Sequence, residues 1–119
     1  MEKIVNKTCI DNLKKSGAPI VIVAAVKEAE AIAYACKDFG IKVEAFCDSE
    51  KRKSQDKFCG LEVIHTPTLP KRFPKARFLI ATQQISDVVD QLSDLGFSEF
   101  YSANELIDKF NLDSHNYAI

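Results

Sequence analysis

Three segments of this sequence carry side chains that could bind a ligand, and each follows a run of apolar residues. The candidate binding residues are Ala24, Ala25, Val26, Lys27, Asp48, Ser49, Lys51, Ala81, Thr82 and Gln83. Their ammonium, carboxylate, hydroxyl and amide groups suit hydrogen bonding to sugars and pairing with phosphates. Ligands of parallel α/β sheets bind beyond the carboxyl ends of the strands, where the strand order switches. We therefore expect the three segments to converge on one site.

Asp48 offers the most specific chemistry in these segments. It follows the second apolar run, about 20 residues beyond the first turn, which is the interval at which dinucleotide-binding folds place an acid for a ribose hydroxyl. An aspartate at the end of a strand is also an ordinary turn former. The sequence leaves both interpretations open.

The turn after the first apolar run lacks the glycines that normally cradle a phosphate. Ala24, Val26 and Ala29 stand at the positions of that motif. The branched side chain of Val26 would occupy the space in which the backbone approaches a pyrophosphate, which disfavours a dinucleotide. The N–H groups at the start of the next helix could still bind a smaller anion with help from Lys27. The alternative is that Lys27 is simply solvated.

The remaining polar residues have structural interpretations beside their functional ones. The basic triplet 51–53 could close over a phosphate or merely keep a loop soluble, and Thr82 could contact a ligand or cap a helix. His65 and His115 have no acid or nucleophile partner visible in the sequence. Neither a nucleophile elbow nor a Walker loop is present. We therefore expect no catalytic residue in this chain.

Apolar runs alternate with helical patterns along the chain, which predicts an α/β fold. We expect a Rossmann-like three-layer sandwich whose mostly parallel sheet has about four or five strands. The predicted strands are 20–25, 41–48, 60–64, 78–82 and 99–101, and the predicted helices are 8–16, 27–39, 84–95 and 103–110. Residues 49–57 read as a loop, and the two prolines in 66–70 should stop the third strand because they lack a backbone donor.

These elements divide the chain into three parts. Residues 1–18 hold the N-terminal helix, 19–110 form the Rossmann-like domain, and 111–119 are a tail or a linker to a further domain. The apolar ending at 117–119 fits either the front part of a longer protein or an ordinary docked terminus.

Composition and charge argue against several partners. The 16 basic and 17 acidic residues create no global field that would attract nucleic acid or an anionic membrane. The apolar run 20–26 is too short to cross a bilayer. The first residues also lack the apolar core of a secretory signal, so we expect a cytoplasmic protein.

The spacing of Cys9, Cys36, Cys47 and Cys59 fits no zinc site or dithiol motif, so we expect buried or half-buried thiols and no metal.

Five segments together resemble the Rossmann-like N-terminal domains of bacterial surface-glycan enzymes. They are 20–25, 43–48, 60–64, 78–82 and the turn 95–97, and the resemblance covers about residues 19–108. Such domains precede sugar O-acyltransferases of the sialic-acid and bacillosamine type and capsule-associated methyltransferases. They hold a nucleotide-linked sugar, while catalysis lies in the attached domain. The resemblance thus implies ligand contacts by Ala24, Ala25, Asp48, Ala81, Thr82 and Gln83, although the glycine motif of the family is absent here.

The leading hypothesis is a non-catalytic accessory domain that binds a nucleotide or nucleotide-sugar. Its expected partners are a covalently attached C-terminal catalytic domain, such as a transferase, or a second copy in a homodimer. One alternative is a ligand-free module that serves for docking or dimerisation. A second alternative is a small NAD(P)-dependent reductase-like protein. The sequence identifies no cofactor.

Overall fold

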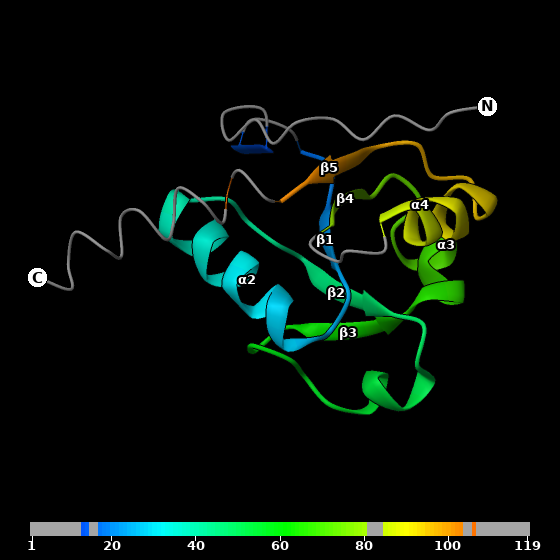
Figure 1. The fold of residues 1–119 in the computed structure, drawn as a ribbon, viewed down its shortest axis with the longest axis horizontal. Helices are drawn as coiled ribbons and strands as arrows, with labels where there is room; N and C mark the ends of the chain where they lie inside the picture. The colour runs from blue at the N-terminus through cyan, green and yellow to red at the C-terminus, as the bar shows by residue number, and fades with distance from the viewer. Residues whose placement is uncertain (1–12, 15–16, 81–84, 104–105, 107–119) are drawn as a thin grey trace, which may run out of the picture.

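A five-stranded parallel sheet forms the centre of the protein (Figure 1). The computed structural model describes residues 13–14, 17–80, 85–103 and 106. The strands are β1 (Ile20–Val23), β2 (Ala45–Asp48), β3 (Glu62–His65), β4 (Arg77–Ile80) and β5 (Phe100–Ser102). They lie in the order β3-β2-β1-β4-β5, and every neighbouring pair is parallel. The strand order therefore switches direction at the β1–β4 pair.

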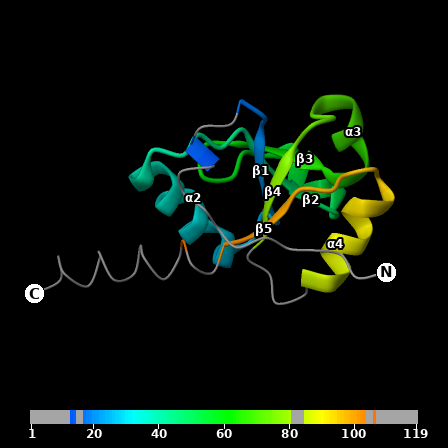
Figure 2. The same ribbon diagram turned by 90° about the horizontal axis from the view of Figure 1, so that it is seen from above.

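Helices cover both faces of this sheet. Helix α2 (Lys27–Phe39) packs on one face, and α3 (Leu69–Arg72) and α4 (Ile85–Asp94) pack on the other, as Figures 1 and 2 show. Two 3₁₀ helices, η1 (Lys51–Gln55) and η2 (Thr66–Thr68), lie in the connections on either side of β3. The molecule is thus a three-layer α/β sandwich of the Rossmann-like type, which confirms the predicted fold class.

The central strand β1 explains why its sequence is apolar without interruption. Ile20 and Ile22 belong to the core cluster under α2, whereas Val21 and Val23 belong to the cluster under α3 and α4. All four residues are buried. A strand covered on both faces cannot alternate between apolar and polar residues, so the continuous run is the pattern that this position requires.

Helix α2 has the limits that its sequence predicts. Its sheet-facing side includes Ala29, Ile32 and Cys36, which are fully buried. Gly40 ends the helix at φ +77°, and the N–H of Ile41 then reaches the Cys36 carbonyl at 2.7 Å. This left-handed end satisfies a carbonyl that the helix leaves open. The predicted helix at 84–95 is found as Ile85–Asp94.

Several strands are shorter than predicted. β1 ends at Val23 because the chain turns at once, with the Val26 N–H bonded to the Ala24 carbonyl at 2.9 Å. β2 begins at Ala45, so residues 41–44 precede the strand instead of forming it. Residues 81–82 of the predicted fourth strand lie outside the described residues, as do most of the predicted helices 8–16 and 103–110.

The two connections around β3 are more ordered than the sequence predicts. The segment predicted as a loop at 49–57 contains the 3₁₀ helix η1. The prolines at 67 and 70 occupy the second positions of η2 and α3. Proline fits there because the first N–H groups of a helix have no intrahelical acceptor. These prolines therefore lie in the first turns of two short helices that follow β3.

The cysteines divide into two groups. Cys36 and Cys47 are buried as predicted, and burial raises the pKa of each thiol to about 12. The prediction is wrong for Cys59, which is exposed because it stands in a two-residue turn. Cys9 lies outside the described residues. Among the described residues, no helix combines the length and apolar character that crossing a bilayer requires.

Candidate functional site

Asp48 joins the turn after β1 to the segment after β2. Its side chain is 6 % exposed. Oδ2 accepts a hydrogen bond from the Ala25 N–H at 3.0 Å, and Oδ1 accepts one from the Glu50 N–H at 2.9 Å. The second bond is the local aspartate-to-backbone contact that favours a turn. Asp48 is therefore both a turn former and a link between two strand ends.

Lys53, on η1, completes this arrangement. Its Nζ lies 3.4 Å from Asp48 Oδ2 and donates to the Ala25 carbonyl at 3.3 Å. The N–H of Ala25 is thus bonded to the last residue of β2, and its carbonyl is bonded to Lys53 beyond that strand. We call Ala25, Asp48 and Lys53 the clamp. An ionised carboxylate has about four acceptor positions, so three donors leave Asp48 with little capacity for further hydrogen bonds.

A cavity of about 350 Å³ opens beside the clamp. It lies where the β2–β3 crossover, residues 49–61, passes the end of β1, and we call it the crossover cavity. Its lining residues are Ala25, Arg52, Lys53, Asp56, Lys57, Phe58 and Val63. The lining combines three cationic side chains with one acidic side chain and an aromatic ring. Such a surface suits an anionic ligand that also carries an apolar or aromatic part.

The aromatic wall of the crossover cavity is held by the surrounding fold. Phe58 meets Phe46 edge to face, with ring centroids 5.0 Å apart and planes at 87°. Phe58 and Leu61 exchange two backbone hydrogen bonds of 2.9 Å across Cys59 and Gly60. Those two residues have φ values of +51° and +77°, the left-handed values that a tight two-residue hairpin turn requires. Phe58 is therefore positioned before any ligand binds.

The structure brings together some of the predicted binding residues. Ala25 and Asp48 are in contact, and Ala25 lines the crossover cavity. Ala24 and Val26 are half-buried. Lys27, Ser49 and Lys51 are exposed, and the cavity lining does not include them. Ala81, Thr82 and Gln83 lie outside the described residues. Contact of these residues with a ligand stays a prediction.

Six of the seven lining residues were absent from the candidate binding residues. Arg52 and Lys53 belong to the basic triplet that was weighed as a phosphate contact, whereas Asp56, Lys57, Phe58 and Val63 had no predicted role in binding. The available signal was the position of Phe58, an aromatic residue directly after the wholly polar run 49–57. A second feature invisible in the sequence is the β2–β3 register, which pairs His65 with Asp48. Both observations depend on how the crossover folds back, and the sequence pattern does not encode that path.

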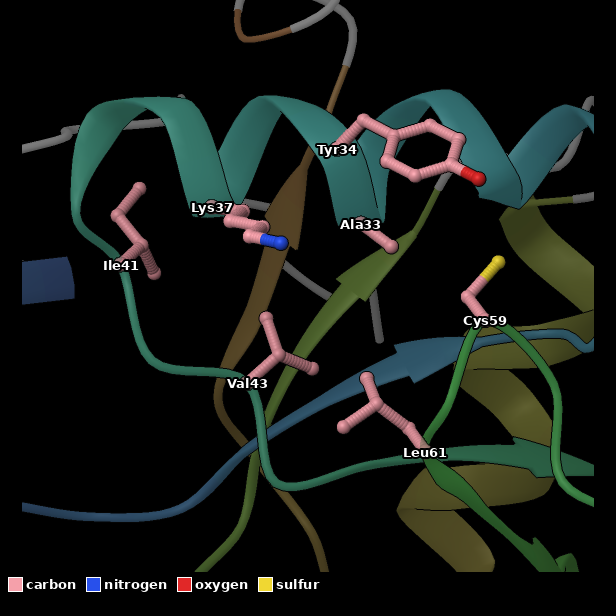
Figure 3. A pocket seen from close by; sticks show the side chains of 7 residues that line it. All are labelled: Ala33, Tyr34, Lys37, Ile41, Val43, Cys59 and Leu61. Atoms are coloured by element: carbon pink, nitrogen blue, oxygen red, sulfur yellow. The ribbon is translucent and has the colours of Figure 1, made fainter.

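A second cavity, of about 260 Å³, lies between α2 and the crossover (Figure 3). Its lining residues are Ala33, Tyr34, Lys37, Ile41, Val43, Cys59 and Leu61. The Tyr34 hydroxyl donates to Glu30 Oε1 at 3.2 Å, and this bond raises the pKa of Tyr34. Burial and the charge of Glu30 raise the pKa of the Cys59 thiol. Cys59 is therefore a weaker source of thiolate than an ordinary cysteine.

The charged surface around β3 includes one well-formed ion pair. Arg72 donates from both terminal nitrogens to the two carboxylate oxygens of Glu62, at 2.9 and 2.7 Å. This pair joins α3 to β3 outside the crossover cavity, and it lowers the pKa of Glu62.

No protein-family model matches the chain, and comparisons with curated proteins and with solved structures give no significant match.

Proposed function

We propose that this chain is a non-catalytic Rossmann-like domain that binds a nucleotide or a nucleotide-sugar. The observation that carries the proposal is the crossover cavity, which opens beside the ends of β1 and β2 with a cationic lining and an aromatic wall. That edge is where parallel α/β sheets bind their ligands. Cationic side chains suit phosphates, and an aromatic ring suits a base.

The size of the cavity favours a ligand smaller than a dinucleotide. Ligand pockets usually span about 300 to 1,000 Å³, and the crossover cavity, at about 350 Å³, is near the lower limit. Val26 stands at the start of α2 and packs against the core cluster under that helix. A pyrophosphate bridge at the first turn would meet this side chain. The reductase-like alternative is accordingly the least supported.

The resemblance to domains of surface-glycan enzymes supports a nucleotide-linked sugar as the ligand. In this proposal, the crossover holds the nucleotide, and a separate catalytic domain of the transferase type acts on the sugar. The protein would then serve bacterial surface-polysaccharide synthesis, such as capsule formation, in the cytoplasm. The described residues contribute binding groups to this activity.

Amide chemical shifts of the ¹⁵N-labelled protein test the proposal. UDP-sugars, NAD(H) and coenzyme A are added in separate titrations. A nucleotide-sugar should shift the amides of Ala25 and of residues 52–58, and the amides of α4 should stay in place because that helix covers the opposite face. Unchanged shifts at Ala25, Asp48 and 52–58 with every ligand would refute nucleotide binding.

A ligand-free docking or dimerisation module is the second candidate, and the clamp favours it. Asp48, for which the sequence left a ribose contact open, already accepts three hydrogen bonds or ion-pair contacts from the protein. Tyr34, at 51 % exposure, supplies an exposed aromatic side chain. This candidate predicts a dimer in sedimentation velocity that Tyr34→Glu dissociates. A monomer at all accessible concentrations would count against self-association.

A further inference from the structure

We propose that the crossover, and not the start of α2, binds the phosphate of the ligand. Arg52 and Lys57 would hold the phosphate, and Phe58 would contact the base. The ligand class is a nucleoside monophosphate or diphosphate, free or as part of a nucleotide-sugar. This inference rests on the proposed function and deepens it, because it assigns the phosphate to particular side chains.

The first reason is that three backbone donors at the first turn already bond to protein acceptors. The Ala25 N–H bonds to Asp48, the Val26 N–H bonds to the Ala24 carbonyl at 2.9 Å, and the Ala29 N–H bonds to the Val26 carbonyl at 2.9 Å. A glycine-rich turn presents such donors to a phosphate. In this chain the amides of Ala25, Val26 and Ala29 are directed to protein acceptors, so the turn offers an anion fewer donors than a glycine-rich turn does.

The second reason is that two cationic side chains of the crossover can bind a phosphate without breaking contacts that stabilise the fold. Arg52 pairs with Glu50 at 3.2 Å, but their side chains are 83 % and 52 % exposed. Exposed ion pairs contribute little stability, so Arg52 can exchange this partner for a phosphate. Lys57 is exposed at the rim of the same cavity. Lys53 differs from both because the clamp fixes it against Asp48 and Ala25.

The third reason is the fixed aromatic wall. Phe58 is adjacent to Lys57 in the chain and lines the same cavity. Its packing on Phe46 and its hairpin turn hold the side chain in place. An aromatic residue beside two cations combines base stacking with phosphate pairing. Proteins that bind single-stranded nucleic acid use the same combination.

Isothermal titration of four probes tests the assignment. The probes are UDP, UMP, uridine and inorganic pyrophosphate, added to the full chain and to the double variant Arg52→Gln, Lys57→Gln. The control double variant, Lys71→Gln and Lys75→Gln, removes the same charge from exposed positions outside the cavity. Circular dichroism verifies that all variants fold. We expect the crossover variant to bind UDP about tenfold more weakly and the control variant to bind it normally.

The outcomes separate the inference from the proposed function. Normal UDP binding by the crossover variant would overturn the inference and leave nucleotide binding intact. A third outcome is that the wild type and the control variant bind pyrophosphate, the crossover variant does not, and none of the proteins binds a nucleotide. That outcome would support the phosphate site and refute the proposed function. Binding of none of the four probes would refute both. The Phe58→Leu variant should weaken UDP binding and leave pyrophosphate binding unchanged, and equal loss of both would refute the role of the ring.

Discussion

Removal of the Asp48 carboxylate tests whether the clamp holds the strand ends together. Asp48→Ala deletes the acceptors of the Ala25 and Glu50 N–H groups and the partner of Lys53. Each hydrogen bond to a charged group contributes about 1.5 to 3 kcal/mol. Two such bonds at the lower value give a loss of about 3 kcal/mol in the free energy of unfolding. For a domain of this size, that corresponds to a fall of about 12 °C in Tm.

Asp48→Asn should lie between the wild type and Asp48→Ala. An amide oxygen can accept one of the two backbone bonds, while the NH₂ group faces the other donor. The expected loss is therefore about 1.5 kcal/mol. Asp38→Asn is a matched control, because Asp38 is an exposed residue in the last turn of α2. Its effect should stay within about 0.5 kcal/mol.

Urea denaturation followed by far-ultraviolet circular dichroism is the suitable assay, since the chain contains no tryptophan. Hydrogen exchange supplies a local readout, and the Ala25 amide should exchange faster in Asp48→Ala. A loss below about 1 kcal/mol, or a loss equal to that of the Asp38 control, would refute the clamp. An unchanged exchange rate at Ala25 would contradict it independently of global stability.

Three further predictions concern pH and the turn at the crossover. Burial raises the pKa of Cys36 and of Cys47 to about 12, whereas both thiols ionise at about pH 8.5 in the unfolded chain. Their contribution to the free energy of unfolding should therefore be complete below about pH 8.5 and fall by up to about 2.7 kcal/mol per pH unit above it. Alkaline urea melts should show this fall, and Cys36→Ala with Cys47→Ala should remove it; a flat profile in the wild type would contradict it. Glu62→Gln should cost about 0.5 kcal/mol at neutral pH, since the exposed pair with Arg72 is weak, and the difference should vanish as the pH falls through the lowered pKa of Glu62; a pH-independent difference in urea melts would exclude this cause. Cys59→Asn should raise the free energy of unfolding by about 0.5 kcal/mol, and with it the Tm, because asparagine tolerates the φ of +51° better than cysteine does. A lower Tm in calorimetry would show that the turn is not strained.

The elements with strong periodicity were predictable from the sequence. Helix α2 has the predicted limits because its small residues face a sheet and Gly40 ends it in a left-handed conformation. The β1 run indicated burial on both faces, and the structure confirms it. In these elements the local sequence preference and the tertiary environment favour the same conformation.

The crossover was not predictable in the same way. Its residues 49–57 are polar and have no regular period, so the sequence indicated only a loop. The fold of this segment depends on long-range contacts: Lys53 reaches Ala25, and Phe58 packs on Phe46. The spacing of Asp48 from the first turn left a ribose contact and a turn former both open, and spacing does not reveal that its carboxylate is bonded to the backbone of that turn. The cavity therefore emerged only from the three-dimensional path of the chain.

An amide-shift titration with UDP tests the central claim most directly. The claim is that the crossover cavity binds a nucleotide through its phosphate. The account predicts that millimolar UDP shifts the amides of Ala25 and residues 52–58, and that Arg52→Gln with Lys57→Gln weakens the effect. Unchanged amides in these segments, or shifts confined to α3 and α4, would contradict it.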